Sequence, residues 1–184
     1  WIDLAGACVG LAAPDEPFAG TADPGDALVG FPSSGIHSNG LTLAREAATR
    51  RHAYTDPFPD DSGRSVGEVL LEPTRIYADL LDDLHEHGTR AAAHVTGGGF
   101  TNLERLGDHR YVVPDPFDPQ PVFGFVAREG SVAREEMYRT FNMGTGFVAA
   151  LPPERAGALA AATDGRVVGH VEEGSGVVVD GLEL

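Results

Sequence analysis

The sequence predicts an α+β domain in which helices pack on a mixed sheet. Apolar runs of strand length alternate with amphipathic helical patterns, but without strict β–α–β regularity. The 184 residues, 42% of them hydrophobic, are enough for one domain with a substantial buried core. The 24 glycines and 13 prolines are scattered along the chain, so they mark turns rather than a low-complexity tract.

The chain opens with two apolar runs that are typical of strands, Ile2–Leu11 and Ala27–Phe31. A helix is predicted over Leu41–Arg50, because its apolar residues recur on one face. Ser38 or Asn39 is the natural N-cap of this helix, because both side chains offer an oxygen acceptor.

Polar residues with interspersed Asp and Pro predict an exposed loop over Arg51–Arg64. An amphipathic helix is then predicted to begin at Pro73 and to end before Gly88. Its apolar face comprises Ile76, Leu80, Leu81 and Leu84.

The second half continues the alternation of strands and helices. The expected strands are Ala91–Val95, Tyr111–Val113, Gly146–Leu151, Arg166–Glu172 and Val177–Val179. The expected helices are a short one ending near Leu106, then Pro121–Arg128, Ala133–Thr140 and Pro153–Thr163.

The charge is strongly negative. The chain has 28 acidic residues against 13 Arg and no Lys, which gives a formal net charge of -15. An acidic shell spread over the whole chain favours a protein that works in concentrated salt, where its self-repulsion is screened. The alternative is codon bias in a GC-rich genome. In either case nucleic acid is excluded as a partner, because binding its phosphates requires a basic face.

The single cysteine, Cys8, excludes an intrachain disulfide and a cysteine-cluster metal site. The first 13 residues lack a basic n-region and contain Asp3, so they do not fit a signal peptide. No apolar run approaches the ~18 residues of a membrane helix. A soluble, cytoplasmic protein is expected. The chain begins at Trp1 and enters an apolar run at once, which is expected of a piece of a longer protein.

Three polar, glycine-rich segments flank predicted strands, where open sheets of α/β proteins hold ligands. The first, Gly30–Gly40, contains three Ser, one His and one Asn immediately before a predicted helix N-terminus, whose free N–H groups favour phosphate. A capped connector is the alternative. The segment is not a nucleophile elbow, because Ser34 lacks the G-x-S-x-G frame.

The second segment, His94–Phe100, has three consecutive glycines that let a ligand approach the backbone, and Asn102 follows it. It does not match a P-loop, which requires Lys. The third segment, Glu135–Gly144, carries Arg139 and Asn142 as candidate ligand contacts. Arg139 is equally compatible with an i,i+4 surface pair with Glu135.

Other polar clusters predict no metal site. His85 and His87 lie two residues apart on a predicted helix and point to different faces, so they are poor co-ligands. Asp60–Asp61 is expected to be solvated, and Asp115 and Asp118 lie in a proline-rich turn.

Four stretches, in order, resemble phosphoribosylformylglycinamidine cyclo-ligase, also called aminoimidazole ribonucleotide synthetase. They are GFPSSGIHSNGLTLAR, EPTRIYADLL, HVTGGGFTNLERL and EEMYRTFNMGTGFV. The resemblance covers nearly the whole chain, and it implies that residues 1–184 are the C-terminal domain alone. It implies a layered α/β/α fold with partial ferredoxin-like topology. The family is a homodimer whose N-terminal domain, absent here, holds most of the ATP and Mg²⁺.

The implied reaction closes the imidazole ring of a phosphorylated ribonucleotide, formylglycinamidine ribonucleotide. ATP phosphorylates the formyl oxygen, then a nitrogen attacks that carbon and phosphate leaves. By the resemblance, His37, Ser34 and Asn39 are the catalytic candidates, and His37 handles a proton or stabilises an oxyanion. The implied substrate-binding residues are Ser33, Gly35, Ser38, Gly40, His94, Thr96, Gly97, Gly98, Gly99, Asn102, Arg139 and Asn142.

Two alternatives keep the same fold. One is a stand-alone binding or assembly module without catalysis, and the other is a related ATP-dependent enzyme with a different substrate. Both substrates of the cyclo-ligase are anions, whereas this chain is acidic. In about 1 M salt the Debye length is near 3 Å, so neutral N–H and hydroxyl donors would decide binding.

Overall fold

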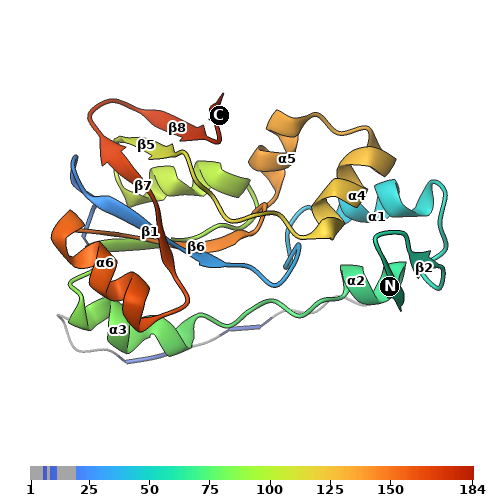
Figure 1. The fold of residues 1–184 in the computed structure, drawn as a ribbon, viewed down its shortest axis with the longest axis horizontal. Coiled ribbons are helices and arrows are strands. Elements are labelled where there is room, and N and C mark those ends of the chain that lie inside the picture. Colours follow the sequence, from blue (N-terminus) through green and yellow to red (C-terminus); the bar gives the residue numbers. More distant parts are fainter. Residues whose placement is uncertain (1–5, 8, 12–19) are drawn as a thin grey trace.

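A seven-stranded sheet forms the centre of the molecule (Figure 1). The computed structural model describes residues 6–7, 9–11 and 20–184. Only β5 and β8 pair in parallel, and the other neighbours are antiparallel, so the predicted mixed sheet is confirmed. In spatial order the strands are β4 (Ala91–His94), β6 (Thr145–Leu151), β1 (Ala27–Pro32), β7 (Arg166–Glu172), β5 (Arg110–Val113), β8 (Gly176–Val179) and β9 (Leu182–Glu183).

Two apolar cores lie on opposite faces of this sheet. Alternate residues of a strand point to opposite faces, so Leu28 joins one core and Val29 the other. The core that contains Leu28 is covered by η2 (Gly99–Leu106), α4 (Pro121–Gly130) and α5 (Arg134–Thr140). The core that contains Val29 is covered by η1 (Ala78–Leu80), α3 (Leu81–Glu86) and α6 (Pro153–Ala162). The layered α+β prediction is therefore confirmed.

A smaller group of elements lies beyond one end of the sheet, at the right of Figure 1. Helix α1 (Leu41–Thr49) packs against α4. A hairpin of β2 (Pro57–Phe58) and β3 (Asp61–Ser65) leads into α2 (Val66–Leu70). Phe58, on β2, is 2% exposed and anchors the hairpin to the main core.

Several predictions between residues 38 and 88 are wrong. The predicted exposed loop over Arg51–Arg64 contains the hairpin, because Phe58 contributes to the core. Helix α2 is absent from the prediction, although Ser65 and Glu68 form a capping box whose S-x-x-E signature is in the sequence. The N-cap of α1 is Gly40, in a left-handed conformation, rather than Ser38 or Asn39.

The helix predicted to begin at Pro73 is also wrong. The chain is irregular up to Tyr77, and helical structure begins only at Ala78. Ile76 is 75% exposed, because Tyr77 turns inward to the core in its place. The remaining strands and helices lie within a few residues of their predicted bounds, and the region before Leu106 is a 3₁₀ helix. Half of the predicted strand Ile2–Leu11 lies outside the described residues, and residues 6–7 and 9–11, which are described, do not form a strand.

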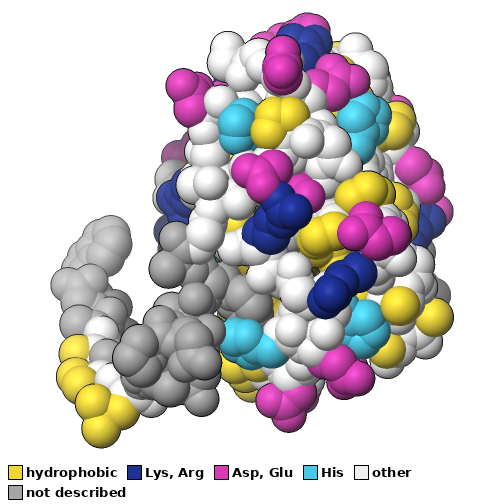
Figure 2. Space-filling view, turned by 90° about the vertical axis from the view of Figure 1, so that its left-hand side faces the viewer, with side chains coloured by type: hydrophobic (Ala, Val, Ile, Leu, Met, Phe, Trp, Pro, Cys, Tyr) yellow, Lys and Arg dark blue, Asp and Glu magenta, His cyan; other side chains and the backbone are white. Residues whose placement is uncertain are grey.

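Charged side chains of both signs share the surface that Figure 2 shows, and the acidic ones predominate. Nine of the 13 arginines form ion pairs with carboxylates in the described part of the chain. Acidic residues number 28 in all, more than twice the number of arginines, so the arginines cannot neutralise all of them.

Candidate functional site at one edge of the sheet

The three polar segments of the sequence meet at one edge of the sheet. Phe147 of β6 is paired with Phe31 of β1 on one side and with His94 of β4 on the other. Because β6 runs antiparallel to both neighbours, its start lies beside the ends of β1 and β4. The segment before β6 is thereby brought next to the segments that follow the other two strands.

The third segment holds the first one in place. The backbone N–H of Ser33 donates to the Gly144 carbonyl at 2.9 Å, and Asn142 Nδ2 donates to the Gly35 carbonyl at 2.8 Å. Gln120, which the sequence did not reveal, donates to the Ser33 carbonyl at 2.6 Å and accepts from Ser33 Oγ at 3.2 Å. Ser33 and Asn142 are therefore engaged in shaping the loop, and Asn142 is fully buried.

His37 is fixed from within its own loop. The backbone N–H of Ser34 donates to His37 Nε2 at 3.1 Å, so Nε2 is an acceptor and the ring proton belongs on Nδ1. The residue is 6% exposed and has a left-handed backbone with φ of 56°. Burial, reinforced by His94 and Arg75, lowers the pKa of His37 to about 4, so the imidazole is neutral near pH 7.

Aromatic rings surround the two histidines. The Tyr77 ring centroid lies 6.3 Å from that of His37 and 5.0 Å from that of His94. Phe147 stacks on Tyr77 at 5.3 Å and meets His94 edge-on at 5.3 Å. Burial lowers the pKa of His94 and raises the pKa of Tyr77. Gly146 is required beneath these rings, because a Cβ there would lie 1.9 Å from the Tyr77 hydroxyl oxygen.

Asn39 and the start of α1 offer unpaired donors. Asn39 is 8% exposed, and its Nδ2 has no hydrogen-bond partner among the described residues. No side chain caps the first turn of α1, whose N–H groups lack intrahelical acceptors. Ser38 is exposed beside them. Such donors favour an anionic ligand.

The second segment forms a tight turn around Asn102. Its Nδ2 donates to the carbonyl oxygens of Gly99 at 2.8 Å and Gly97 at 3.3 Å, and Thr96 Oγ1 donates to its Oδ1 at 3.4 Å. Asn102 is 3% exposed, so its side chain supports the turn from the buried side. The exposed Gly97 has open space where a Cβ would stand.

The glycines of the second segment differ in their roles. Gly98 and Gly99 have φ values of 109° and 54°, which side-chain-bearing residues adopt at a cost. A Cβ on Gly99 would lie 2.0 Å from the Tyr138 carbonyl oxygen, so this glycine packs the turn onto the end of α5. Gly97 is the position of this turn with open space around it, because a Cβ on Gly98 would lie 3.2 Å from Asn102 Nδ2.

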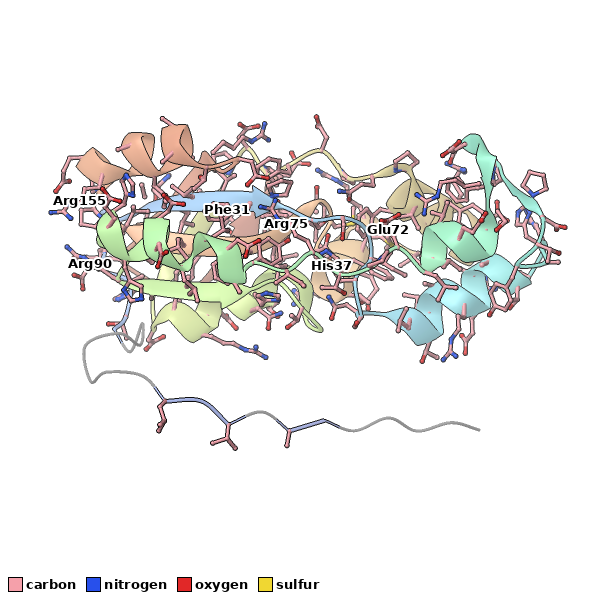
Figure 3. The ribbon with its side chains drawn as sticks, turned by 90° about the horizontal axis from the view of Figure 1, so that it is seen from below. Phe31, His37, Glu72, Arg75, Arg90 and Arg155 are labelled. Carbon is pink, nitrogen blue, oxygen red and sulfur yellow. The ribbon has the colours of Figure 1, made fainter. Side chains whose placement is uncertain are left out.

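Two arginines near the edge are held in ion pairs. Arg139 pairs with Glu135 at 3.2 Å, which is the i,i+4 surface pair that the sequence left open. Arg75, which the sequence did not single out, lies 4.9 Å above the Tyr77 ring and forms a bidentate ion pair with Asp164. Figure 3 shows Arg75 close to His37, and its charge contributes to the low pKa of that histidine.

A small cavity lies behind the first segment. Its volume is about 150 Å³, and Ser34, Gly35 and Gln120 line the side that faces the loop. The Arg64–Glu72 ion pair, at 2.6 Å, lines another side. Within residues 6–7, 9–11 and 20–184, no group of three or more His, Cys, Asp or Glu side chains is arranged to hold a metal ion.

Fold and edge together define a class of protein. It is an α+β domain that carries imidazoles, an unpaired amide and backbone N–H groups at one edge of its sheet, and such groups can donate hydrogen bonds to a phosphorylated molecule. The chain belongs to the family of AIR synthase related proteins, as their C-terminal domain, which it matches over residues 23–181. In the described part of the chain, none of the helices has the length and apolar character of a membrane span.

Curated relatives share the sequence closely. A phosphoribosylformylglycinamidine cyclo-ligase of Methanopyrus kandleri is 48% identical over 99% of this chain, which covers 54% of that protein. The protein of the same name from Methanosarcina acetivorans is 44% identical over 98% of this chain, again 54% of its own length. The chain thus spans about half the length of the curated relatives it matches.

Solved structures share the fold at low sequence identity. AaThiL, complexed with AMPPCP and TMP, has a TM-score of 0.57 at 18% identity, with 90% of this chain and 50% of that chain covered. T. maritima PurL, complexed with FGAR, has a TM-score of 0.52 at 16% identity, with 90% and 27% covered. At these identities the likeness concerns the fold alone.

Proposed function

We propose that this chain is the C-terminal, substrate-side half of an ATP-dependent cyclo-ligase that closes the imidazole ring of formylglycinamidine ribonucleotide. The observation that carries the proposal is the neutral His37, locked by the Ser34 N–H beside the unpaired amide of Asn39 and the uncapped start of α1. The cyclo-ligase relatives support the identity of the substrate.

The proposed partner is an N-terminal ATP-binding domain, and the complete protein is proposed to be a cytoplasmic homodimer. The buried, unpaired Nδ2 of Asn39 and the free N–H groups of α1 fit a phosphate group. When bound, ATP supplies the phosphoryl group that turns the formyl oxygen into a leaving group. By the resemblance to the cyclo-ligases, we propose that the N-terminal domain holds Mg²⁺ together with ATP.

The tautomer of His37 decides its role in this proposal. Nε2 already accepts from Ser34, and Nδ1 carries a proton, so the ring can donate a hydrogen bond but not take up a proton at Nδ1. A neutral donor aimed at developing negative charge stabilises a transition state. We assign this electrostatic role to His37, with the Asn39 amide as a second donor.

Ring closure also releases a proton from the attacking nitrogen as the C–N bond forms and phosphate leaves. His94 is the candidate acceptor of that proton. Burial keeps its imidazole neutral, and no hydrogen bond engages its ring among the described residues. Gly97, three residues further on, leaves the backbone open to the ribonucleotide.

The proposal is tested by assaying the full-length protein for ATP-dependent ring closure. His37→Ala should lower turnover by roughly 10²- to 10⁴-fold with the fold intact, because the transition state loses its donor. His170→Ala is the matched control, since His170 is exposed on β7 and pairs with Glu172. Near-wild-type turnover by His37→Ala would remove His37 from the mechanism.

The 184-residue chain alone should not turn over substrate, because the proposed nucleotide site is shared with the N-terminal half. The check is the same assay with the purified chain and, separately, with the chain mixed with the N-terminal half. ATP-dependent cyclisation by the chain alone would refute the division of the site.

A further inference from the structure

Residues Glu72–Tyr77, named here the crossing segment, run over the site loop without regular structure. Ser34 Oγ donates to the Pro73 carbonyl at 2.6 Å and accepts from the Arg75 backbone N–H at 3.1 Å. The one hydroxyl therefore joins the loop to the crossing segment through two hydrogen bonds. Because the Ser34 backbone N–H holds His37, a shift of the crossing segment would be passed to the imidazole.

The crossing segment is itself fastened to the sheet. The Tyr77 hydroxyl donates to the Pro32 carbonyl at 2.9 Å, and Arg75 donates to the same oxygen at 3.3 Å. Arg75 also binds Asp164 through both ends of its guanidinium, at 2.6 and 2.8 Å. Asp164 lies just before β7, so this pair connects the crossing segment to β7, the strand that pairs with β1 on the side away from β6.

These contacts occupy most of the donors of Arg75. Its side chain is 25% exposed, and the Asp164 carboxylate, the Pro32 carbonyl and the Tyr77 ring take up its hydrogen-bonding ends and one face. The Arg75 hydrogen bond lowers the pKa of Asp164, so the pair stays charged over the physiological range. Arg75 is thus arranged to hold structure rather than to bind substrate.

We infer that the Arg75–Asp164 ion pair is a positioning element that fixes the crossing segment and, through Ser34, the orientation of His37. The inference rests on the proposed function, because the orientation of His37 matters for the ring-closure step. An exposed ion pair contributes little to stability, typically 0–1 kcal/mol. Orientation is more sensitive, because a misplacement of about 1 Å can cost 10²-fold in rate.

The test uses Arg75→Ala, Asp164→Ala and the double variant in the full-length protein. Each single variant should lower kcat by roughly 10- to 100-fold with KM for ATP changed less than about 3-fold. The double variant should be no worse than either single variant, since the two side chains act as one unit. Asp164→Asn, which keeps the shape and one acceptor, should lose less activity and guards against misfolding.

The matched control is Asp115→Ala. Asp115 pairs with Arg166 at 3.5 Å at the same edge, and Arg166 lies 4.5 Å above the Phe117 ring. The Arg166 backbone pairs with Gly30 of β1, but among the described residues neither side chain hydrogen-bonds to residues 33–40. The kcat of Asp115→Ala should stay within about 2-fold of that of the wild type. A fall equal to that of Asp164→Ala would mean that any ion pair at this edge matters, and it would overturn the inference.

A second readout is independent of activity. Histidine ring ¹⁵N shifts of the full-length protein should report the Nδ1–H tautomer of His37 in the wild type and in Asp115→Ala. In Arg75→Ala and Asp164→Ala the shifts should move towards a mixture of tautomers. Unchanged His37 shifts would overturn the inference. If the wild type fails to close the ring, the proposed function fails, and the shifts alone still decide the positioning role.

Discussion

At the scale of single residues, His37 is the group whose charge state its surroundings control most directly. Burial is the main cause of its low pKa, and His94 and Arg75 add to it. Both the left-handed backbone of His37 and the missing Cβ of Gly146 are needed to seat the ring. A buried neutral imidazole also makes stability depend on pH.

The sign of that dependence follows from the two pKa values. Between about pH 4, the value of folded His37, and 6.5, its ordinary value, the unfolded chain binds a proton that the folded chain does not. Stability is therefore full above pH 6.5 and falls as the pH drops towards 4. His37→Gln should reduce this loss, measured by denaturant unfolding across that range. Equal slopes for the wild type and His37→Gln would contradict the prediction.

Much of the candidate site was predictable at the residue scale, since local polarity and glycine content single out Gly30–Gly40 and the turn after His94. The contributions of Arg75 and Asp164 were not predictable, because they meet only through the fold and neither lies in a glycine-rich stretch. Asn142 and Asn102 were named as ligand contacts, whereas the structure places both in buried supporting hydrogen bonds. An Asn that follows a tight turn serves either purpose, and sequence alone does not separate them. The binding roles of the other named residues stay predictions.

At the scale of elements, the start of α1 packs against the end of α5 at a single glycine. Gly40 is the N-cap of α1 with φ of 58°, and a Cβ there would lie 2.4 Å from a Phe141 ring carbon. The close contact between Gly40 and Phe141 sets the position of the start of α1, which we propose binds the phosphate group. A larger residue must therefore move either α1 or the aromatic ring.

Gly40→Ala should destabilise the chain by about 2 kcal/mol, through left-handed strain and overpacking. Gly157→Ala is the opposite control, because Gly157 lies inside α6 with open space around its Cβ position. That variant should be stabilised by about 0.5–1 kcal/mol. The measurement is urea unfolding of the three proteins. A stable Gly40→Ala variant would show that α1 and α5 are less tightly coupled than the geometry implies.

Elements with clear periodicity were predicted well, and those set by tertiary contacts were not. Strand β1 and helix α4 follow from their apolar patterns. The crossing segment has the periodicity of a helix but the contacts of a connector, because its polar atoms bond to Ser34 and Pro32 rather than to its own backbone. Tertiary hydrogen bonds overrode the local pattern there.

At the scale of the whole molecule, the excess of carboxylates dominates. The ion pairs that nine arginines make leave a net charge of -15 unchanged, so the folded chain carries a large self-repulsion. Screening by salt reduces that repulsion most in the compact state. Adaptation to salt and codon bias therefore predict different responses of the protein's stability to salt concentration.

The melting temperature should climb as potassium chloride rises from low salt into the molar range, because the Debye length falls to about 3 Å at 1 M. Differential scanning calorimetry at constant pH checks this. A flat response would favour codon bias as the origin of the composition. The isolated chain is the right sample, since its own carboxylates are the source of the effect.

The register that joins Phe31, Phe147 and His94 has a consequence for folding. These three residues lie far apart in the sequence, so the edge comes into being only after β6 has inserted between β1 and β4. Pairings of such long range form late and slowly. A nascent chain would carry every proposed catalytic and substrate-binding residue and still be unable to bind, until β6 has been made. Ligand added during refolding would then accumulate on the finished domain alone and draw the population towards it.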